Sequence, residues 1–156
     1  MNHSGQANKQ YFQRQLVYIE ENIKDLTNLY ISSTPIQERL KHFFSLYVLE
    51  LEEILKQNQK NGFIASIPKV YIGTKVTVMY LDDQETEEYV ICFPEESDPD
   101  KGFISFLSPV GRQLLLKNIG EELSLKIPTG ELGVSIKEIS YFGGLLEFDT
   151  QQTKEA

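Results

Sequence analysis

Cysteine and tryptophan are nearly missing from the 156-residue sequence, which has one cysteine, Cys92, and no tryptophan. One cysteine excludes an internal disulfide framework and a metal site built from several thiolates. No apolar run approaches the roughly 20 residues that a membrane-spanning helix needs. Residues 1–9 are too polar for a secretory signal peptide. We therefore expect a soluble, cytoplasmic protein that makes no membrane contact and carries no metal or other cofactor.

Basic residues are also scarce, because 15 Lys and Arg stand against 23 Asp and Glu, a net charge of −8. Residues 1–66 hold seven of each sign, so residues 67–156 carry the whole acidic excess. Affinity for nucleic acid depends on clustered Lys and Arg, and we expect no direct DNA binding. A protein partner with a basic surface suits this charge better.

Residues 8–60 are predicted to form an antiparallel helical hairpin, a two-stranded coiled coil. Apolar residues of the first helix recur at alternating spacings of four and three, the heptad seam of a helix lying against one partner. They are Phe12, Leu16, Ile19, Ile23, Leu26 and Tyr30. The pattern breaks at residues 31–35, where Thr34 and Pro35 suit an N-cap and a first-turn proline. Such a short connection makes the two helices antiparallel neighbours.

The second helix has more apolar surface than one partner helix can cover. One seam consists of Ile36, Leu40, Phe43, Tyr47, Leu51 and Ile54, and a second seam beside it of Phe44, Val48 and Leu55. The additional surface requires another contact. We expect it to pack on the second domain or on the N-terminal residues, and a dimer interface is the alternative.

The period of the apolar pattern changes after a linker at residues 61–68, which opens with the helix-stop pair Asn61-Gly62. A domain at residues 69–142 and a tail at 143–156 follow. Within the domain, Ser108-Pro109 opens a short helix that extends to Leu116. The strand patterns fall at residues 70–78, 89–93, 102–107, 121–127 and 132–141. The sequence therefore predicts an α+β chain whose second domain is a small antiparallel sheet with one helix.

This second domain is similar to the C-terminal domain of the Gre-type bacterial transcript-cleavage factors. The most specific piece is Ile104-Ser-x-x-Ser-Pro-x-Gly-Arg-x-Leu114, which follows the strand pattern of residues 70–78. Gly120-Glu and Pro128-x-Gly-Glu come later, in the family's order. The resemblance implies an FKBP-like globular domain that grips the rim of the secondary channel of RNA polymerase. The coiled coil would point down that channel toward the active site.

The resemblance also implies a polymerase-binding loop before the short helix. We assign this loop to Phe106, Leu107, Ser108, Pro109 and Arg112. Family members usually have Asp or Asn where this chain has Leu107. From the residues alone, helix capping explains Ser108 and Pro109 as well as a direct contact does. Leu107 either keeps the polymerase contact by apolar packing or marks a changed partner.

The tip of the coiled coil departs from the cleaving family members. We assign the tip to Ile31, Ser32, Ser33, Thr34 and Glu38. In the cleaving members, an Asp-x-x-Glu pair at the tip helps to hold Mg²⁺, a cation that prefers carboxylate oxygens. This tip lacks the pair, since Asp25 and Glu38 flank the loop on opposite helices. The arm also looks a few turns shorter, at ~5.4 Å a turn.

These features predict a non-catalytic, Rnk-like relative of the Gre factors that binds RNA polymerase and modulates elongation without stimulating cleavage. We expect a monomer or a weak dimer. Two alternatives stay open. In the first, the chain would be an active cleavage factor that uses Asp25 or Glu38. In the second, it would be an adaptor that kept the fold and changed its protein partner. We expect the tail, residues 143–156, to pack on the chain's own body.

Overall fold

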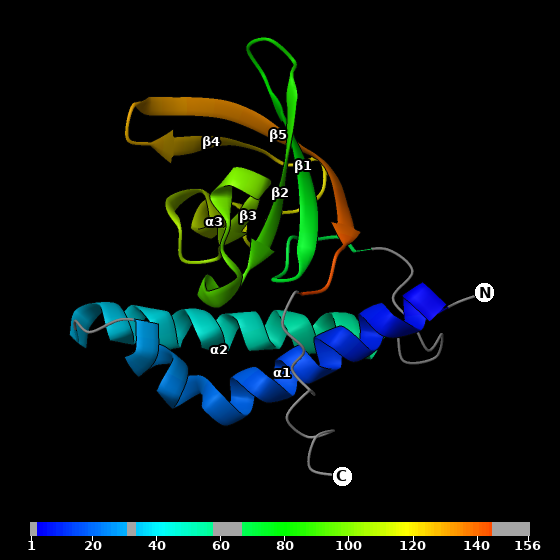
Figure 1. Cartoon of the computed structure of the whole chain (residues 1–156), viewed down its shortest axis with the longest axis vertical. Helices are drawn as coiled ribbons and strands as arrows, with labels where there is room; N and C mark the ends of the chain where they lie inside the picture. Colours follow the sequence, from blue (N-terminus) through cyan, green and yellow to red (C-terminus); the bar gives the residue numbers. More distant parts are fainter. Residues whose placement is uncertain (1–2, 31–33, 58–66, 145–156) are drawn as a thin grey trace. The chain divides into compact units, whose positions relative to one another are not determined.

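The computed structural model describes residues 3–30, 34–57 and 67–144 (Figure 1). Within the helices, residues 3–8, 23–30 and 34–39 are described as backbone only. The chain divides into two compact units, one of which contains both long helices, while the other spans Ser66–Leu146. No helix in these described ranges is long and apolar enough to cross a membrane.

The helical unit consists of α1, His3–Tyr30, and α2, Thr34–Gln57. The two helices run antiparallel and lie against each other (Figure 1). Helix α1 begins at His3, earlier than the predicted residue 8. Its first residues lack the apolar repeat on which the prediction relied, but a helix can extend through them once it has formed. Helix α2 begins at Thr34, so Pro35 lies in its first turn, where the missing N–H costs no hydrogen bond.

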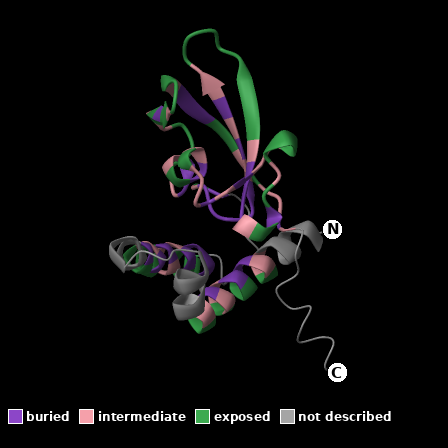
Figure 2. Ribbon diagram, turned by 60° about the vertical axis from the view of Figure 1, so that its left-hand side comes forward, coloured by how far each residue is buried: buried purple, intermediate pink, exposed green. Residues whose placement is uncertain are grey.

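Burial along the helices follows the predicted seams only in part (Figure 2). On α1, Phe12, Gln15 and Ile19 are fully buried, whereas Leu16 is only half-buried. On α2, both predicted seams contribute to the buried set. Its members are Leu40, Phe44, Tyr47, Leu51, Ile54 and Leu55. Leu46 and Leu49 stay exposed, so part of the apolar surface of α2 has no cover in the described structure.

The second unit is built on a curled five-stranded sheet with the order β3-β2-β1-β5-β4. Its strands are β1 Thr74–Tyr80, β2 Thr86–Cys92, β3 Phe103–Ser105, β4 Glu122–Ile127 and β5 Gly130–Tyr141. The α+β class predicted from the sequence is confirmed. The predicted all-antiparallel sheet is wrong at one edge, because β3 runs parallel to β2.

The parallel pair follows from the length of the connection between β2 and β3. Two short 3₁₀ helices, Pro94–Glu96 and Pro99–Lys101, lie within it and carry the chain back to a point opposite Val90, so that β3 pairs with the last residues of β2. A tight hairpin permits only antiparallel pairing, whereas this longer crossover permits parallel pairing. Asp98 then bridges to Phe103 through two backbone hydrogen bonds of 2.8 and 3.1 Å, which cover the outer side of β3.

A β-bulge contributes to the curl of the sheet. Thr77 of β1 pairs with Glu138, but the next residue, Val78, pairs with Ile136, so Lys137 is the extra residue on β5. Bulges bend a strand and increase its local twist. The long strand β5 curves across the top of the domain in Figure 1, and the short helix α3, Pro109–Leu114, lies within the curl.

The core of this unit lies between the inner face of the sheet and α3. Alternate residues along the strands point into this core, as expected for a sheet with one buried face. The fully buried members are Val76, Val78, Ile91, Leu114, Val134 and Ile136, with Leu125 1% exposed. Phe142, which follows β5, stacks edge-on against Phe103 with ring centroids 5.2 Å apart. The predicted packing of the rest of the tail concerns residues 145–156, which lie outside the described ranges.

Candidate protein-docking loop

The docking loop, residues 105–112, comprises the end of β3, the turn after it and the first residues of α3, and the buried side chain of Phe106 anchors it. The Phe106 side chain is 1% exposed and meets Phe93 edge-on, with ring centroids 5.7 Å apart. Its backbone N–H donates to the Cys92 carbonyl at 2.9 Å. Phe106 was assigned to the polymerase-binding loop, and the structure places it in the core. It can hold the loop in position, but its side chain does not reach the surface.

Two serine side chains fix the turn that follows. The Ser108 hydroxyl accepts from the Gly111 N–H at 3.1 Å, which makes Ser108 the N-cap of α3, and donates to the Ser105 carbonyl at 2.7 Å. The Ser105 hydroxyl accepts from the Leu107 N–H at 2.9 Å. The helix cap predicted for Ser108 and Pro109 is therefore confirmed. A direct contact by either residue stays a prediction.

Gly111 is required by the close approach of the helix to the preceding strand. A Cβ atom at this position would lie 2.1 Å from the Ser105 carbonyl oxygen and 2.9 Å from the Ser108 hydroxyl. Both distances are far below van der Waals contact, and the first atom belongs to the backbone. The glycine therefore allows the turn from Ser105 to α3 to be this tight. This close approach and the hydrogen bonds of Ser105 and Ser108 restrict the conformations of the loop.

The outer surface of the loop presents apolar groups next to a positive charge. Leu107 and Ser108 are half-buried, whereas Pro109 and Arg112 are exposed. Arg112 forms no ion pair with any residue in the described ranges. Its guanidinium group is thus available to a carboxylate on another molecule. A rigid loop with a central apolar contact and a cation at its rim has the composition of a small protein-binding surface.

Cys92, directly behind this loop, is an inert part of the core. Its thiol lies 3.5 Å from the Ile104 carbonyl, to which it donates. Burial, helped by the nearby carboxylates of Glu96 and Glu95, raises the pKa of Cys92 to about 12. Because the nucleophilic form of cysteine is the thiolate, this residue has no nucleophilic role at neutral pH.

Gln113 is a structural residue that the sequence reasoning missed. Its side-chain N–H donates to the Pro109 and Lys126 carbonyls, at 2.8 Å each. Its side-chain oxygen accepts from the Lys126 backbone N–H at 2.7 Å. The amide group thus binds α3 to the edge of β4 as a neighbouring strand would. Lys126 is distant in sequence, so no local pattern signals this contact.

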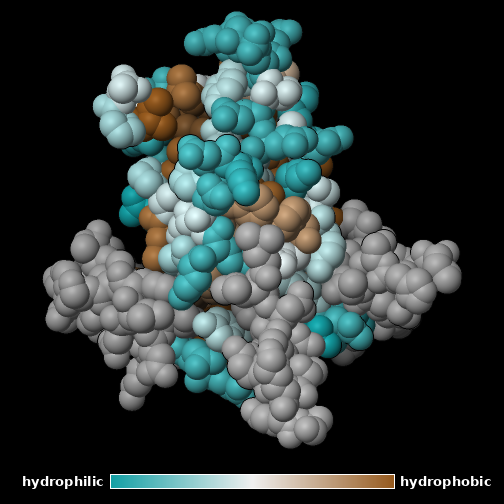
Figure 3. All heavy atoms as spheres, in the orientation of Figure 1, coloured by the Kyte–Doolittle hydropathy of each residue, from teal (hydrophilic) through white to brown (hydrophobic). Residues whose placement is uncertain are grey.

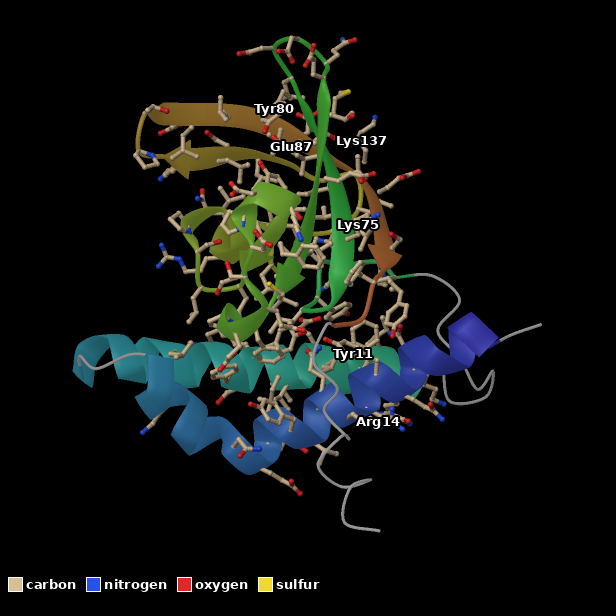
Figure 4. The ribbon with its side chains drawn as sticks, in the orientation of Figure 1. Tyr11, Arg14, Lys75, Tyr80, Glu87 and Lys137 are labelled. Carbon is tan, nitrogen blue, oxygen red and sulfur yellow. The ribbon has the colours of Figure 1, made fainter. Side chains whose placement is uncertain are left out.

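The β1–β2 hairpin and the connection that follows β2 are strongly acidic. Residues 82–100 contain nine Asp and Glu and no Lys or Arg. The tip of this hairpin is hydrophilic in Figure 3. Next to the tip, the Tyr80 hydroxyl donates to the Glu87 carboxylate (Figure 4). It also lies 3.4 Å from the Tyr89 hydroxyl. Burial and these bonds raise the pKa of Tyr80, so it stays protonated as a donor.

The residues assigned to the tip of the helical hairpin cannot be placed. Ile31, Ser32 and Ser33 lie outside the described residues. Thr34 and Glu38 belong to α2, and Asp25 belongs to α1, but their side chains are not described. Within the described part of the chain, no group of three or more His, Cys, Asp and Glu side chains is arranged to hold a metal ion.

Comparison with known proteins assigns the second unit to a family. The model of the GreA/GreB transcription elongation factor C-terminal domain matches residues 65–141. Relatives named transcription elongation factor GreA include one from Wolinella succinogenes, 39% identical over 100 residues. Another, from Chlorobium phaeovibrioides, is 49% identical over 72 residues. The matches cover 64% and 46% of this chain but only 62% and 45% of these relatives, less than two thirds of their length.

A solved structure shares the fold. The GreA/GreB transcription elongation factor from Nitrosomonas europaea superposes with a TM-score of 0.50 at 22% identity, over 78% of this chain and 91% of that one. The second unit is therefore an α+β domain of the GreA/GreB C-terminal type. The similarity of the chain to the Gre family rests on this domain.

Proposed function

We propose that this chain is a Gre-like protein that docks at the secondary channel of RNA polymerase and modulates elongation without stimulating transcript cleavage. The observation that carries the proposal is the rigid loop at residues 105–112, built from the motif that resembles the family's polymerase-binding loop. The protein would act in the cytoplasm, beside the polymerase, as a binding factor and not as an enzyme.

Docking would use the exposed chemistry of this loop. Leu107 and Pro109 would pack against an apolar spot on the polymerase, and Arg112 would pair with a carboxylate at its rim. Such rim charges mainly affect the rate and specificity of association. Ser105, Ser108 and Gly111 would act indirectly, since they hold the loop in a single shape and so reduce the entropy lost on binding.

The helical pair would enter the channel and restrict access through it. Helix α1 has 28 residues and α2 has 24, which corresponds to rods of about 42 and 36 Å. The sequence between them, Ile31-Ser-Ser33, contains no carboxylate. Since a catalytic Mg²⁺ needs oxygen ligands of this kind, the proposed effect is steric.

Docking can be tested with purified core RNA polymerase and charge-reversal variants. Arg112→Glu is expected to weaken binding at least about tenfold, because it replaces a cation at the contact with a charge of the wrong sign. Lys137→Glu is the matched control, since Lys137 is exposed on the bulge of β5, and it should bind as the wild type does. Equal binding by both variants, or none by the wild type, would show that the loop is not the docking surface.

A further inference from the structure

The outer edge of β4 is open over part of its length. Strand β4 lies at the end of the sheet and pairs only with β5. The Lys126 N–H and carbonyl face away from β5, since both bond Gln113. Backbone direction alternates along a strand, so the peptide groups of Ser124 and Glu122 face the same way. Within the described ranges, neither of these two residues has a backbone partner on that side.

An open edge of this kind can pair with another strand, because its backbone N–H and C=O groups have no partner there. Gln113 occupies one of its three outward positions with a side-chain amide, which supplies the donor and the acceptor that a strand would supply. A second strand can therefore pair along the whole edge only after Gln113 has moved away. Gln113 thus blocks strand pairing at one end of the edge.

The outer edge of β4 as a whole, with Lys126 included, is complementary to itself. Glu122, Ser124 and Lys126 are all exposed and share one face of the sheet. If two copies of β4 pair antiparallel about Ser124, each Glu122 lies directly opposite Lys126 of the second copy. Opposite charges in directly opposed positions stabilise such a pair, and like charges destabilise it. The sequence of the edge therefore favours a second copy of the same chain as its partner.

We propose that the edge of β4 is a self-association surface, that two copies pair antiparallel about Ser124, and that Gln113 holds this surface closed. The wild-type chain is then monomeric or only weakly dimeric through this edge. Loss of the Gln113 hydrogen bonds exposes all three positions and allows up to six backbone bonds between the copies. The inference does not depend on polymerase binding.

The test compares Gln113→Leu with the wild type by sedimentation over a concentration series. Leucine keeps the size of the side chain but cannot bond Lys126, so we expect a dimer at least about tenfold tighter than that of the wild type. Gln113→Glu serves as a second variant, because a carboxylate still accepts from the Lys126 N–H but cannot donate to its carbonyl. It should give an intermediate affinity. Near-ultraviolet circular dichroism establishes that both variants are folded.

Charge swaps identify the surface. In the Gln113→Leu chain, Glu122→Lys places like charges opposite each other and should abolish the dimer. The further change Lys126→Glu restores opposite charges in reverse order and should restore it. Oxidation of a Gln113→Leu, Ser124→Cys chain should link the two copies at the symmetric centre, where facing Cα atoms lie about 5.5 Å apart. A monomeric Gln113→Leu chain, or a dimer unaffected by Glu122→Lys, would overturn the proposal.

Discussion

The Tyr47 hydroxyl donates a hydrogen bond to the side-chain oxygen of Gln15 between α2 and α1, and both side chains are completely buried. This bond explains why Gln15 is buried in place of Leu16, the residue that the heptad pattern favours. Buried polar pairs of this kind can specify one arrangement of helices at some cost in stability.

The Gln15–Tyr47 bond can be measured with a double-mutant cycle. Tyr47→Phe and Gln15→Leu should each destabilise the helical unit by about 1–3 kcal/mol, because each removes one partner of a buried hydrogen bond. The double variant should be less destabilised than the sum of the two, since it removes both partners. Urea unfolding followed by circular dichroism gives the three free energies. Strictly additive losses would mean that the bond contributes nothing.

The cap and the glycine of the docking loop should differ in their effect on stability. Ser108→Ala removes the N-cap of α3 and should lower the free energy of unfolding by about 1 kcal/mol. Gly111→Ala forces a methyl group against the Ser105 carbonyl and should lower it by about 3 kcal/mol or more. Ser140→Ala, at an exposed position on β5, is the control and should change it by less than about 0.5 kcal/mol. A tolerated Gly111→Ala would contradict the tight turn.

A pair of carboxyl groups should make the helical unit more stable at mildly acidic pH. Burial and the neighbouring Glu52 of α2, with a smaller effect of Glu21, raise the pKa of Glu20 on α1. The folded unit therefore binds the proton of the Glu20 carboxyl group more tightly than the unfolded chain does. The resulting stability is present below the ordinary Glu pKa and is lost as the pH rises through the raised value.

Glu20→Gln removes the charge and should reveal this repulsion. At pH 7 the variant should be more stable than the wild type by about 0.2–0.5 kcal/mol, a small value because Glu20 is exposed and screened by solvent. The advantage should shrink as the pH falls toward 5. Thermal unfolding of both proteins at the two pH values measures it, and a pH-independent difference would exclude the carboxyl pair as its source.

The buried thiol of Cys92 should be unreactive in the folded protein. Its pKa of about 12 leaves almost no thiolate at pH 8. A thiol reagent should therefore label the native chain far more slowly than the urea-unfolded chain at the same pH. Rapid labelling of the native chain would show that the strand behind the docking loop opens easily.

Local patterns in the sequence predict much of this structure. The Ser108-Pro109 pair predicts the start of α3, and the Thr34-Pro35 pair predicts the start of α2, because capping involves only neighbouring residues. Heptad spacing predicts the first helix, and the short connection after it predicts that the two helices run antiparallel. Gly111 appears in the family motif, but the need for it becomes visible only from the position of the Ser105 carbonyl.

Contacts between distant residues account for what the sequence does not predict. Nothing near Gln113 indicates that it bonds Lys126, and nothing near Gln15 indicates Tyr47 as its partner. The parallel pairing of β3 depends on the path of the crossover through two 3₁₀ helices, which the Pro and acidic residues there do not specify. The β1 strand begins at Thr74 instead of residue 70 because Gly73, with φ of +98°, turns the chain.

The most direct measurement of the central claim is competition at a backtracked elongation complex. A cleaving Gre factor shortens the RNA in the presence of Mg²⁺, and rising concentrations of this chain are added. We expect the chain alone to leave the RNA intact and to suppress the cleavage by the other factor, whereas Arg112→Glu should suppress it much less. Shortening of the RNA by the chain alone, or no competition at saturating concentration, would contradict the account.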